Sequence, residues 1–326
     1  KCIQGLVEGL RRKGAGVVNL IAQKISVIVM TLNAEAYIKS MLDILSRQTI
    51  KPIEVIVADS ESTDKTIEIA RTFDFVSILN IKRSEFDHGG SRHHAFEQSI
   101  GDFVLFFTQD AVIEQDNYIE QMISNFEDES VAMVCARQKA KPNAFHYERL
   151  IRDFNYPLTR KVRSKADIKT MGIKAFYMSD ACSAYRRTAY FDLGGFEHPI
   201  LTNEDMFIAA RALEKGYKTV YDPEAYVLHS HNFSFMQEYK RNFDVAAFMV
   251  MHKSVFADMK IEGEGARLVK YVSKNLLKHF HVISFIKFGF ICIAKFAGNR
   301  KGRNIEKMSP VEIKKNSGLP SWWDRL

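Results

Sequence analysis

Residues 25–59 read ISVIVMTLNAEAYIKSMLDILSRQTIKPIEVIVAD, an apolar run, a segment with helical spacing and a second apolar run. The runs at 25–31 and 53–59 are short and rich in Val and Ile, which is typical of strands buried on both faces. The segment at 34–48 between them repeats its apolar residues at the helical period. Two buried strands joined through a helix predict parallel pairing, because parallel strands need such a crossover.

The same alternation continues along the chain and predicts an α/β fold, a Rossmann-like, mainly parallel sheet flanked by helices. Further strands are expected at 76–81, 103–109 and 131–137, and further helices at 63–72, 90–100 and 115–127. In the turn before the first of these helices, Asp64 is expected to act as a helix cap. We expect an N-terminal extension at 1–24, a catalytic domain at 25–232 and a helical region at 233–326.

The second half of the sheet domain has a less regular pattern. Residues 139–178 lose periodicity and carry mixed charge with several aromatics, which suggests an inserted segment that faces the substrate. A block follows with SAYRR at 183–187, a turn at the LGGF of 193–196, a helix that begins in NEDMF at 203–207, and a strand around 219–231. After this strand the chain is helical in character and rich in Phe, Lys and Met.

Composition is that of an ordinary globular protein with a full core: 326 residues, 46% hydrophobic and 26% charged. Four cysteines lie far apart without metal-finger spacing, so we expect reduced thiols, mostly core fillers, in a cytosolic compartment. The start of the chain has neither an initiator Met nor a signal-peptide cleavage pattern, and is expected to be a truncated or processed end.

The net charge of +7 is concentrated at the C-terminal end. Residues 260–326 hold fourteen Lys and Arg against five Asp and Glu, a net +9, which leaves −2 for the rest. Such a region suits an anionic membrane surface or nucleic acid, or it is simply a solvated basic face. No spanning helix is expected, because the apolar segment 282–298 is interrupted by Lys287 and Lys295.

One helix in this region predicts an amphipathic, basic surface. Four cations fall at three- and four-residue spacing on one helical face: Arg267, Lys270, Lys274 and Lys278. This pattern suits a helix that lies on an anionic bilayer, or a helix that packs on the catalytic domain with a solvated basic side. A nucleic-acid-binding protein is the less favoured class, because no module interleaves basic and aromatic residues.

Polar side chains follow three of the expected strands, at the edge where α/β sheets bind ligands. Thr31 and Asn33 follow the first strand, Asp59 ends the second, and Asp110 follows FVLFFTQ. Asp59 either shapes the turn or contacts a base or ribose. Asp110 must be solvated, paired or metal-bound, since a buried unpaired carboxylate is costly. A divalent cation on a pyrophosphate needs only one or two such carboxylates.

Several motifs in order resemble the inverting, nucleotide-sugar glycosyltransferases of the GT-A fold (glycosyltransferase family 2). They are SVIVMTLNAEAYI, ADSESTD, FDHGGSR, TQDA, SAYRR with LGGF, NEDMFIAARALEKGYK and VLHSHNFS. More narrowly, they resemble the bacterial rhamnosyltransferases of surface-polysaccharide assembly. The resemblance covers about 25–245, and the C-terminal SWW is also similar to that subgroup.

The resemblance implies a role for each motif. Thr31, Asn33 and Asp59 would contact the nucleoside of the donor. TQDA stands where the family usually has a DxD motif, so its Gln and Asp, Gln109 and Asp110, would face the donor, and the Asp would hold Mg²⁺ or Mn²⁺. Thr108 replaces the family's first acid, which weakens the expectation of tight metal binding.

Three further assignments follow from the same motifs. Arg92 of FDHGGSR would pair with a phosphate or orient Asp110. His229 would contact the metal or a phosphate, with His231 behind it, although a strand-end histidine is more often structural. The glycines of LGGF, Gly194 and Gly195, are expected to make a turn.

NEDMF implies the catalytic base. The acceptor hydroxyl must lose its proton as it attacks the anomeric carbon, and Asp205, with Glu204 beside it, fits that role by position. Acids in the first turn of a helix are also favoured by the helix dipole for ordinary stability reasons.

Together these features predict a metal-dependent inverting glycosyltransferase. The expected donor is a dTDP-sugar, most plausibly rhamnose, and the acceptor a lipid-linked saccharide or polysaccharide. The enzyme is expected to be cytoplasmic and peripheral on the inner face of the cell membrane. The alternatives are the same fold with a UDP-hexose donor, or a non-catalytic sugar-nucleotide-binding subunit, against which the pair Glu204–Asp205 argues.

Overall fold

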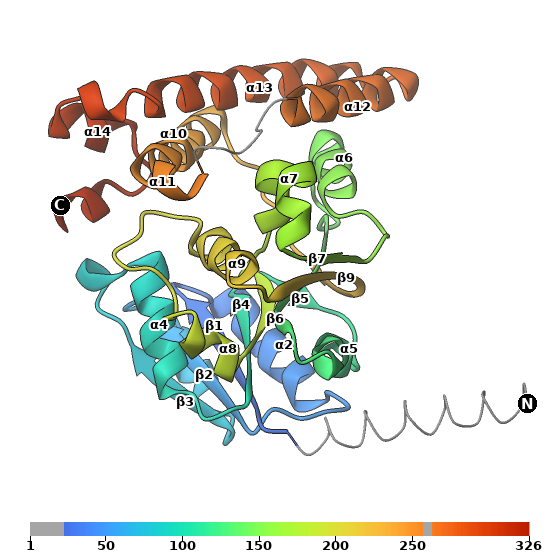
Figure 1. Ribbon diagram of the computed structural model, residues 1–326, viewed down its shortest axis with the longest axis vertical. Helices are drawn as coiled ribbons and strands as arrows, with labels where there is room; N and C mark the ends of the chain where they lie inside the picture. Colours follow the sequence, from blue (N-terminus) through green and yellow to red (C-terminus); the bar gives the residue numbers. More distant parts are fainter. Residues whose placement is uncertain (1–22, 257–262, 326) are drawn as a thin grey trace, which may run out of the picture.

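A computed structural model of the chain describes residues 23–256 and 263–325. It contains a nine-stranded sheet with the order β3-β2-β1-β4-β8-β6-β9-β5, in which β7 also pairs with β9. A layer of helices from the C-terminal region lies over one end of this sheet domain (Figure 1). The expected α/β fold class is confirmed. Nearly all of the expected N-terminal extension lies outside the described residues.

The first half of the sheet has the parallel pairing that the sequence predicts. The parallel strands are β1 (Ile25–Thr31), β2 (Glu54–Asp59), β3 (Val76–Asn80) and β4 (Phe103–Thr108). The crossover helices are α2 (Glu35–Ser46), α3 (Thr66–Ala70) and α4 (His88–Gln98). Asp64 accepts the backbone N–H groups of Thr66 and Glu35, each at 3.0 Å, at the starts of α3 and α2, although the N-cap position of α3 is Lys65.

The second half of the sheet is mixed. β8 (Cys182–Arg186) runs antiparallel to both of its neighbours, β4 and β6 (Val131–Lys139). β9 (Lys218–Leu228) is parallel to β6, while β5 (Val112–Ile113) and β7 (Lys161–Arg163) are antiparallel to β9. The segment between β6 and β8 ends beside the carboxyl end of β4, where Cys182 pairs with Phe107. β8 therefore starts there and runs back along β4.

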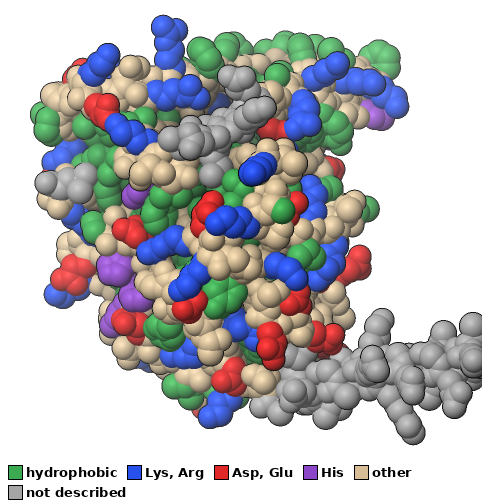
Figure 2. Space-filling model, in the orientation of Figure 1, with side chains coloured by type: hydrophobic (Ala, Val, Ile, Leu, Met, Phe, Trp, Pro, Cys, Tyr) green, Lys and Arg blue, Asp and Glu red, His purple; other side chains and the backbone are tan. Residues whose placement is uncertain are grey.

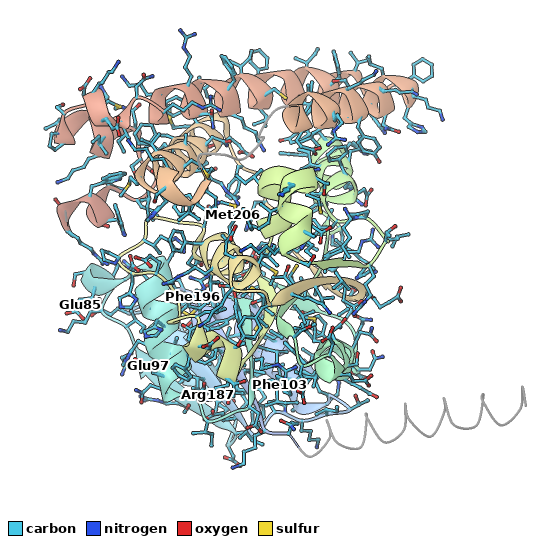
Figure 3. All side chains as sticks on the ribbon, in the orientation of Figure 1. Glu85, Glu97, Phe103, Arg187, Phe196 and Met206 are labelled. Carbon is cyan, nitrogen blue, oxygen red and sulfur yellow. The ribbon has the colours of Figure 1, made fainter. Side chains whose placement is uncertain are left out.

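Alternate strand residues build a core on each face of the sheet. In β1, Val27 and Val29 pack with α2 and with α5 (Tyr118–Ser124), whereas Ile28 and Met30 pack with helices of the other face. Those helices are α4, α8 (Arg187–Asp192) and α9 (Glu204–Glu214). The domain is thus a three-layer sandwich, and Phe196, labelled in Figure 3, lies in its second core.

The C-terminal region is helical, as the sequence predicts. It contains α10 (Phe235–Met251), α11 (Lys253–Phe256), α12 (Glu264–Lys278), α13 (Val282–Gly302), α14 (Pro310–Asn316) and a final 3-10 turn at Pro320–Arg325. Segment 139–178 forms α6 (His146–Asn155), β7 and α7 (Ile168–Met171). Tyr147 and Ile151 of α6 pack against α12 and α13, so this segment supports the helical layer.

Within the described residues, α13 alone is long and apolar enough to cross a membrane, judged by length and composition. The expectation that no helix spans a membrane stays a prediction, because length and composition alone do not place a helix in a bilayer. Lys287 and Lys295 do interrupt the segment, but two cations in an 18-residue window leave its mean hydropathy at 1.5. One side of α13 packs closely on α10.

The described cysteines are free thiols, and Gly194 and Gly195 form a turn, as the sequence predicts. Cys135 and Cys182 are buried and Cys292 is half-buried, all as free thiols. Cys2 lies outside the described residues. Gly194 and Gly195 have φ angles of +78° and +71°, and they end α8 in a turn that side chains would strain.

Candidate active site

The carboxyl ends of β1, β2 and β4 lie side by side because these strands are parallel. Thr31 donates its hydroxyl to Oδ1 of Asp59, 2.8 Å away. Asp59 is buried, and its Oδ2 accepts the backbone N–H of Ser62 at 2.8 Å. Asn33, in a left-handed conformation, accepts the N–H of Thr63 at 2.9 Å. Asp59 and Asn33 therefore order the loops that border the crevice.

A cavity of about 410 Å³ opens at this edge of the sheet, and we call it the strand-end cavity. Three side chains that the sequence assigns to donor binding line it: Thr31, Arg92 and Gln109. Gln109 is held by the peptide of Leu32, whose N–H donates to Oε1 at 2.6 Å and whose carbonyl accepts from Nε2 at 3.0 Å. The other three candidates, Asn33, Asp59 and Asp110, lie outside its lining.

Arg92 lies between two buried carboxylates. Its Nη1 is 3.2 Å from Oε1 of Glu204, and its Nε is 3.7 Å from Oδ2 of Asp180. It also donates to the backbone carbonyl of His88 at 3.0 Å. The expectation that Arg92 orients Asp110 was wrong, because its guanidinium is engaged by the acids next to the expected base. A buried arginine needs such partners to offset desolvation.

Asp205 lies in the first turn of α9 and has an unusual environment. Its Oδ2 accepts the backbone N–H of Asp180 at 3.2 Å, and its Oδ1 accepts that of Met206 at 2.7 Å. Burial raises the pKa of Asp205 well above its usual range, and the charges of Glu204 and Asp180 raise it further. Burial would raise the pKa of Glu204, but the charges of Arg92 and His88 and a backbone hydrogen bond together lower it. Two adjacent acids are thus pushed apart in pKa, as in sites that do acid–base chemistry.

Asp180 is a member of this group that the sequence analysis missed. Its Oδ1 accepts hydrogen bonds from the hydroxyls of Ser183, at 2.7 Å, and Tyr185, at 2.6 Å. Burial raises its pKa to about 6, although Arg92 opposes the shift. The sequence did mark this position. Asp180 lies two residues before strand β8, just as Asp110 lies two residues after strand β4.

A second cluster forms where β4 and β9 end. Nε2 of His229 lies 3.3 Å from Oδ1 of Asp110, and Nδ1 of His231 lies 3.7 Å from its Oδ2. One ligand atom from each of the three residues lies within 4.8 Å of the others. Burial would raise the pKa of Asp110, but a protonated His229, with help from Lys141, would hold it well below the usual range.

The hydrogen bonds of His229 indicate which ring nitrogen carries the proton when the imidazole is neutral. Its Nδ1 is 2.9 Å from Oε1 of Gln138, and that oxygen is the acceptor because the Gln138 amide nitrogen donates to Ser179. Nε2 of the neutral ring then has a lone pair that faces Asp110 and lies 3.1 Å from Nε2 of His231. Burial lowers the pKa of His229, and it lowers that of His231 to about 4. A cation between these atoms would relieve the repulsion of their lone pairs.

Lys141 contacts the same carboxylate and was not foreseen from the sequence. Its ammonium lies 2.8 Å from Oδ2 of Asp110 and 5.2 Å from the ring centroid of Tyr37. Lys141 comes from a segment without periodicity, where no local pattern marks it. It neutralises part of the charge of Asp110 and is placed to meet an anionic group that approaches this cluster.

A second cavity, of about 310 Å³, joins the two clusters, and we call it the Asp205 cavity. Asp205, His229 and His231 line it, with Arg241 of α10 on the side of the helical layer. Segment 139–178 supplies seven of its lining residues. Met206, labelled in Figure 3, also lines the cavity and lies between the sheet domain and the helical layer.

Comparison with known proteins identifies relatives over almost the whole chain. The family model described as Glycosyl transferase family 2 matches residues 26–194. The O-antigen chain rhamnosyltransferase RfbN of Salmonella typhimurium is 37% identical over 312 residues, 93% of this chain and 97% of that protein. The O-antigen chain rhamnosyltransferase WbaN of Salmonella anatum is 40% identical over 311 residues, 92% and 96% of the two chains.

Solved structures share the fold at low identity. The mannosyltransferase PcManGT from Pyrobaculum calidifontis, in complex with GDP-Man and Mn²⁺, has a TM-score of 0.58 at 17% identity and covers 86% of this chain and 87% of its own. The TarS 1–349 structure of S. aureus has a TM-score of 0.52 at 20% identity and covers 79% and 72%.

Proposed function

Because the chain belongs to glycosyl transferase family 2, we propose that it is an inverting hexosyltransferase that moves rhamnose from dTDP-rhamnose to a saccharide of a bacterial surface polysaccharide. Two relatives that match more than 90% of the chain are named O-antigen chain rhamnosyltransferases, which supports this donor sugar. A UDP-hexose remains the alternative donor, since the fold accepts several nucleotides.

One observation carries the proposal. A half-buried carboxyl with a raised pKa, Asp205, faces the same cavity as the histidines of the Asp110 cluster. The proposed base and the histidines of the proposed metal site thus border one space, in which we place the acceptor hydroxyl and the anomeric carbon. Two other cavities among the described residues, the strand-end cavity and one lined by Met206, Met249 and Arg303, do not pair an aspartate with two histidines.

The proposed reaction is a single displacement. The acceptor oxygen forms a bond to the anomeric carbon as the bond from that carbon to the diphosphate breaks, and the hydroxyl proton moves to a carboxylate oxygen of Asp205. The raised pKa makes Asp205 a stronger base once it is ionised. Glu204 and Asp180 hold Arg92, and Asp180 also donates its backbone N–H to Asp205. These contacts position the base.

A divalent metal fits the Asp110 cluster. Asp110 and His229 would hold it, and His231 is close enough to act as a third ligand. One carboxylate with two imidazoles favours Mn²⁺ over Mg²⁺, because Mg²⁺ prefers oxygen ligands. When bound, such an ion supplies positive charge to the diphosphate leaving group. Lys141, beside it, adds a second cation at the same place.

For the donor, we propose that Thr31 and Gln109 contact the nucleoside directly in the strand-end cavity. Asn33 and Asp59 act on the same group by holding the loops around it, given that Asp59 is already hydrogen-bonded to Thr31 and Ser62. Arg92 lines the same cavity and would face the diphosphate or the sugar, with its charge balanced by Glu204.

We propose a lipid-linked acceptor at the cytoplasmic face of the membrane, met by an enzyme bound to that surface. Six apolar side chains of α13 are exposed: Val282, Ile283, Ile286, Phe290, Ile293 and Phe296. Figure 2 shows apolar side chains along the upper edge of the molecule, with basic ones beside them. An apolar face bordered by cations is typical of helices that lie in the plane of an anionic bilayer.

The proposed function is tested with a panel of nucleotide sugars. We expect hydrolysis or transfer with dTDP-rhamnose that depends on Mn²⁺ or Mg²⁺, and loss of this activity in Asp205→Asn. Turnover of a UDP-hexose together with inactivity toward dTDP-rhamnose would replace the donor assignment. Full activity of Asp205→Asn would remove the proposed base.

A further inference from the structure

The end of the chain returns to the beginning of the sheet domain. After α14, the 3-10 turn at Pro320–Arg325 lies against the loop before α4. Trp322 donates its indole N–H to Oδ2 of Asp87 at 2.8 Å, across 235 residues of sequence. Figure 1 shows this C-terminal turn between the helical layer and the loop that leads into α4. We call residues 317–325 the C-terminal segment.

Both ends of the C-terminal segment are anchored. On one side, Ser317 donates its hydroxyl to Oδ1 of Asp244 in α10 at 2.6 Å, and the N–H of Gly318 donates to Oδ2 at 2.7 Å. On the other side, Arg325 donates to the carbonyls of Ser84 and Phe86 at 2.8 and 2.7 Å. Such bonds at both ends hold the segment in one place.

Asp87 connects the C-terminal segment to the catalytic elements. Its Oδ1 accepts the N–H of Gly90 at 2.6 Å, which caps α4, the helix that carries Arg92. Its Oδ2, besides Trp322, accepts the N–H of Ile200 at 3.0 Å, in the loop before α9. A single buried carboxylate thus joins the C-terminal segment, α4 and the loop that leads into α9, the helix of the proposed base.

The C-terminal segment forms one wall of the strand-end cavity. Leu319, Ser321 and Trp322 line it together with Thr31 and Gln109 at the strand ends. Trp322 is only 3% exposed, and it packs with Leu201, Ala247 and Ile305. Its ring is therefore fixed before any ligand enters. A fixed aromatic wall with a few polar groups opposite is typical of a small-molecule site.

We propose that the C-terminal segment is part of the donor site, and that the ring of Trp322 contacts the nucleoside diphosphate sugar bound at the strand ends. This deepens the proposed function and rests on it, because it takes the strand-end cavity to be the donor site. The part of the indole that borders the cavity supplies an apolar contact, and the bond of the indole to Asp87 fixes its orientation. The expected role is in donor affinity and donor choice.

Intrinsic fluorescence tests the proposal directly, since the protein has two tryptophans and both lie in the C-terminal segment. Trp323→Phe leaves Trp322 as the sole fluorophore, and Trp322→Phe leaves Trp323, which does not line the cavity. We expect dTDP, added with Mn²⁺, to change the emission of the Trp323→Phe protein saturably. The Trp322→Phe protein should respond weakly or not at all.

Calorimetry adds an affinity measurement. Trp322→Ala should weaken the binding of dTDP or dTDP-rhamnose at least tenfold, and Trp322→Phe, which keeps a flat ring, by less. The matched control is Trp323→Ala, in the same apolar cluster but outside the cavity, which should bind within about twofold of wild type. Melting temperatures of all variants separate lost binding from lost folding.

The outcomes distinguish this inference from the function on which it rests. Nucleotide binding seen by calorimetry without a change in Trp322 emission, or with equal affinity in Trp322→Ala, would overturn the inference and leave the proposed function standing. A response of Trp322 to UDP or GDP but not to dTDP would keep the inference and overturn the donor. No binding of any nucleoside diphosphate to wild type would overturn both.

Discussion

Asp205 is the residue on which the proposed chemistry depends most. Asp205→Asn keeps the size and most hydrogen bonds of the side chain but cannot take a proton. We expect kcat to fall by roughly 10²- to 10⁴-fold, the usual contribution of a general base. Donor affinity should stay within a few-fold, because the base acts on the acceptor. Steady-state kinetics and calorimetry with the nucleotide sugar measure the two effects.

A matched control for this variant lies at the other end of the same helix. Glu214→Gln makes the same kind of change on an exposed side chain that pairs with Lys165. It should leave kcat unchanged. If Asp205→Asn turns over at close to the wild-type rate under saturating donor, the base lies elsewhere.

Asp180 allows a test of how the pKa of Asp205 is raised. Asp205 serves as a base only when ionised, so kcat should fall as the pH drops through its pKa. Asp180→Asn removes one of the negative charges that raise this pKa. The acidic limb of the profile of kcat against pH should then move to lower pH. A limb that stays in place, in a variant that still melts cooperatively, would contradict the coupling.

Asp110 is the residue that should make donor binding depend on metal. Asp110→Ala removes the only carboxylate of the cluster. We expect it to weaken binding of the nucleotide sugar in the presence of Mn²⁺ much more than binding of the nucleoside, which lacks the diphosphate. Calorimetry with and without the metal measures this difference, and Asp116→Ala, an exposed acid of the following loop, is the control. Equal donor affinity with and without metal would refute the site.

At the scale of elements, the contact between α10 and α13 depends on small side chains. Ala294, Gly298 and Gly302 repeat every four residues on the buried side of α13. A Cβ on Gly298 would lie 2.1 Å from the carbonyl oxygen of Tyr239, a backbone atom of α10. Glycine is otherwise unfavourable inside a helix, so its presence here reflects the close approach of the two backbones.

This contact predicts opposite effects for two substitutions in one helix. Gly298→Ala should destabilise the protein by roughly 1–3 kcal/mol, because the two helices must move apart. Gly289→Ala, where a new Cβ meets no atom within 4 Å, should stabilise it by up to about 1 kcal/mol through helix propensity. Denaturant unfolding measures both. A stabilising Gly298→Ala would mean that α13 does not pack on α10 in solution.

At the scale of the whole molecule, the helical layer presents two surfaces suited to a membrane. The cations of α12 are exposed, while Val272 and Leu276 pack inward. The sequence suggested this basic face as the contact, and the structure adds the apolar stripe on α13. Phe280, 88% exposed between the two helices, extends that stripe.

The two surfaces should be separable in a liposome co-sedimentation assay. Reversal of Arg267, Lys270, Lys274 and Lys278 to Glu should remove the part of binding that salt weakens, at roughly 1 kcal/mol per cation near the surface. Ile283→Asp with Phe290→Asp should remove the part that persists in salt. Donor hydrolysis should survive in both variants.

The control for this assay reverses the same number of charges on the sheet domain. Lys39, Arg47, Lys51 and Arg71 belong to α2, α3 and the loops after these helices, and all are exposed. Their reversal should leave liposome binding intact. If the wild-type protein stays in solution with anionic liposomes at low salt, the helical layer is not a membrane contact.

The alternation of strands and helices from residue 25 could be read directly from the sequence, because the spacing of apolar residues is a local property. Periods of two and 3.6 residues decide which side chains an element buries. The same local reasoning located Asp59 and Asp110, since parallel strands that end together bring their following residues to one edge. The concentration of cations after residue 260 needed no structure either.

Contacts between distant parts of the chain could not be derived in this way. The reversed direction of β8, the placement of Arg92 between Glu204 and Asp180, and the ion pair of Lys141 with Asp110 all join residues that have no periodic relation. The bond from Trp322 to Asp87 spans 235 residues. Spacing along a chain predicts which residues share a face of one element, but which elements then meet is decided by how whole faces pack, and only the folded molecule contains that information.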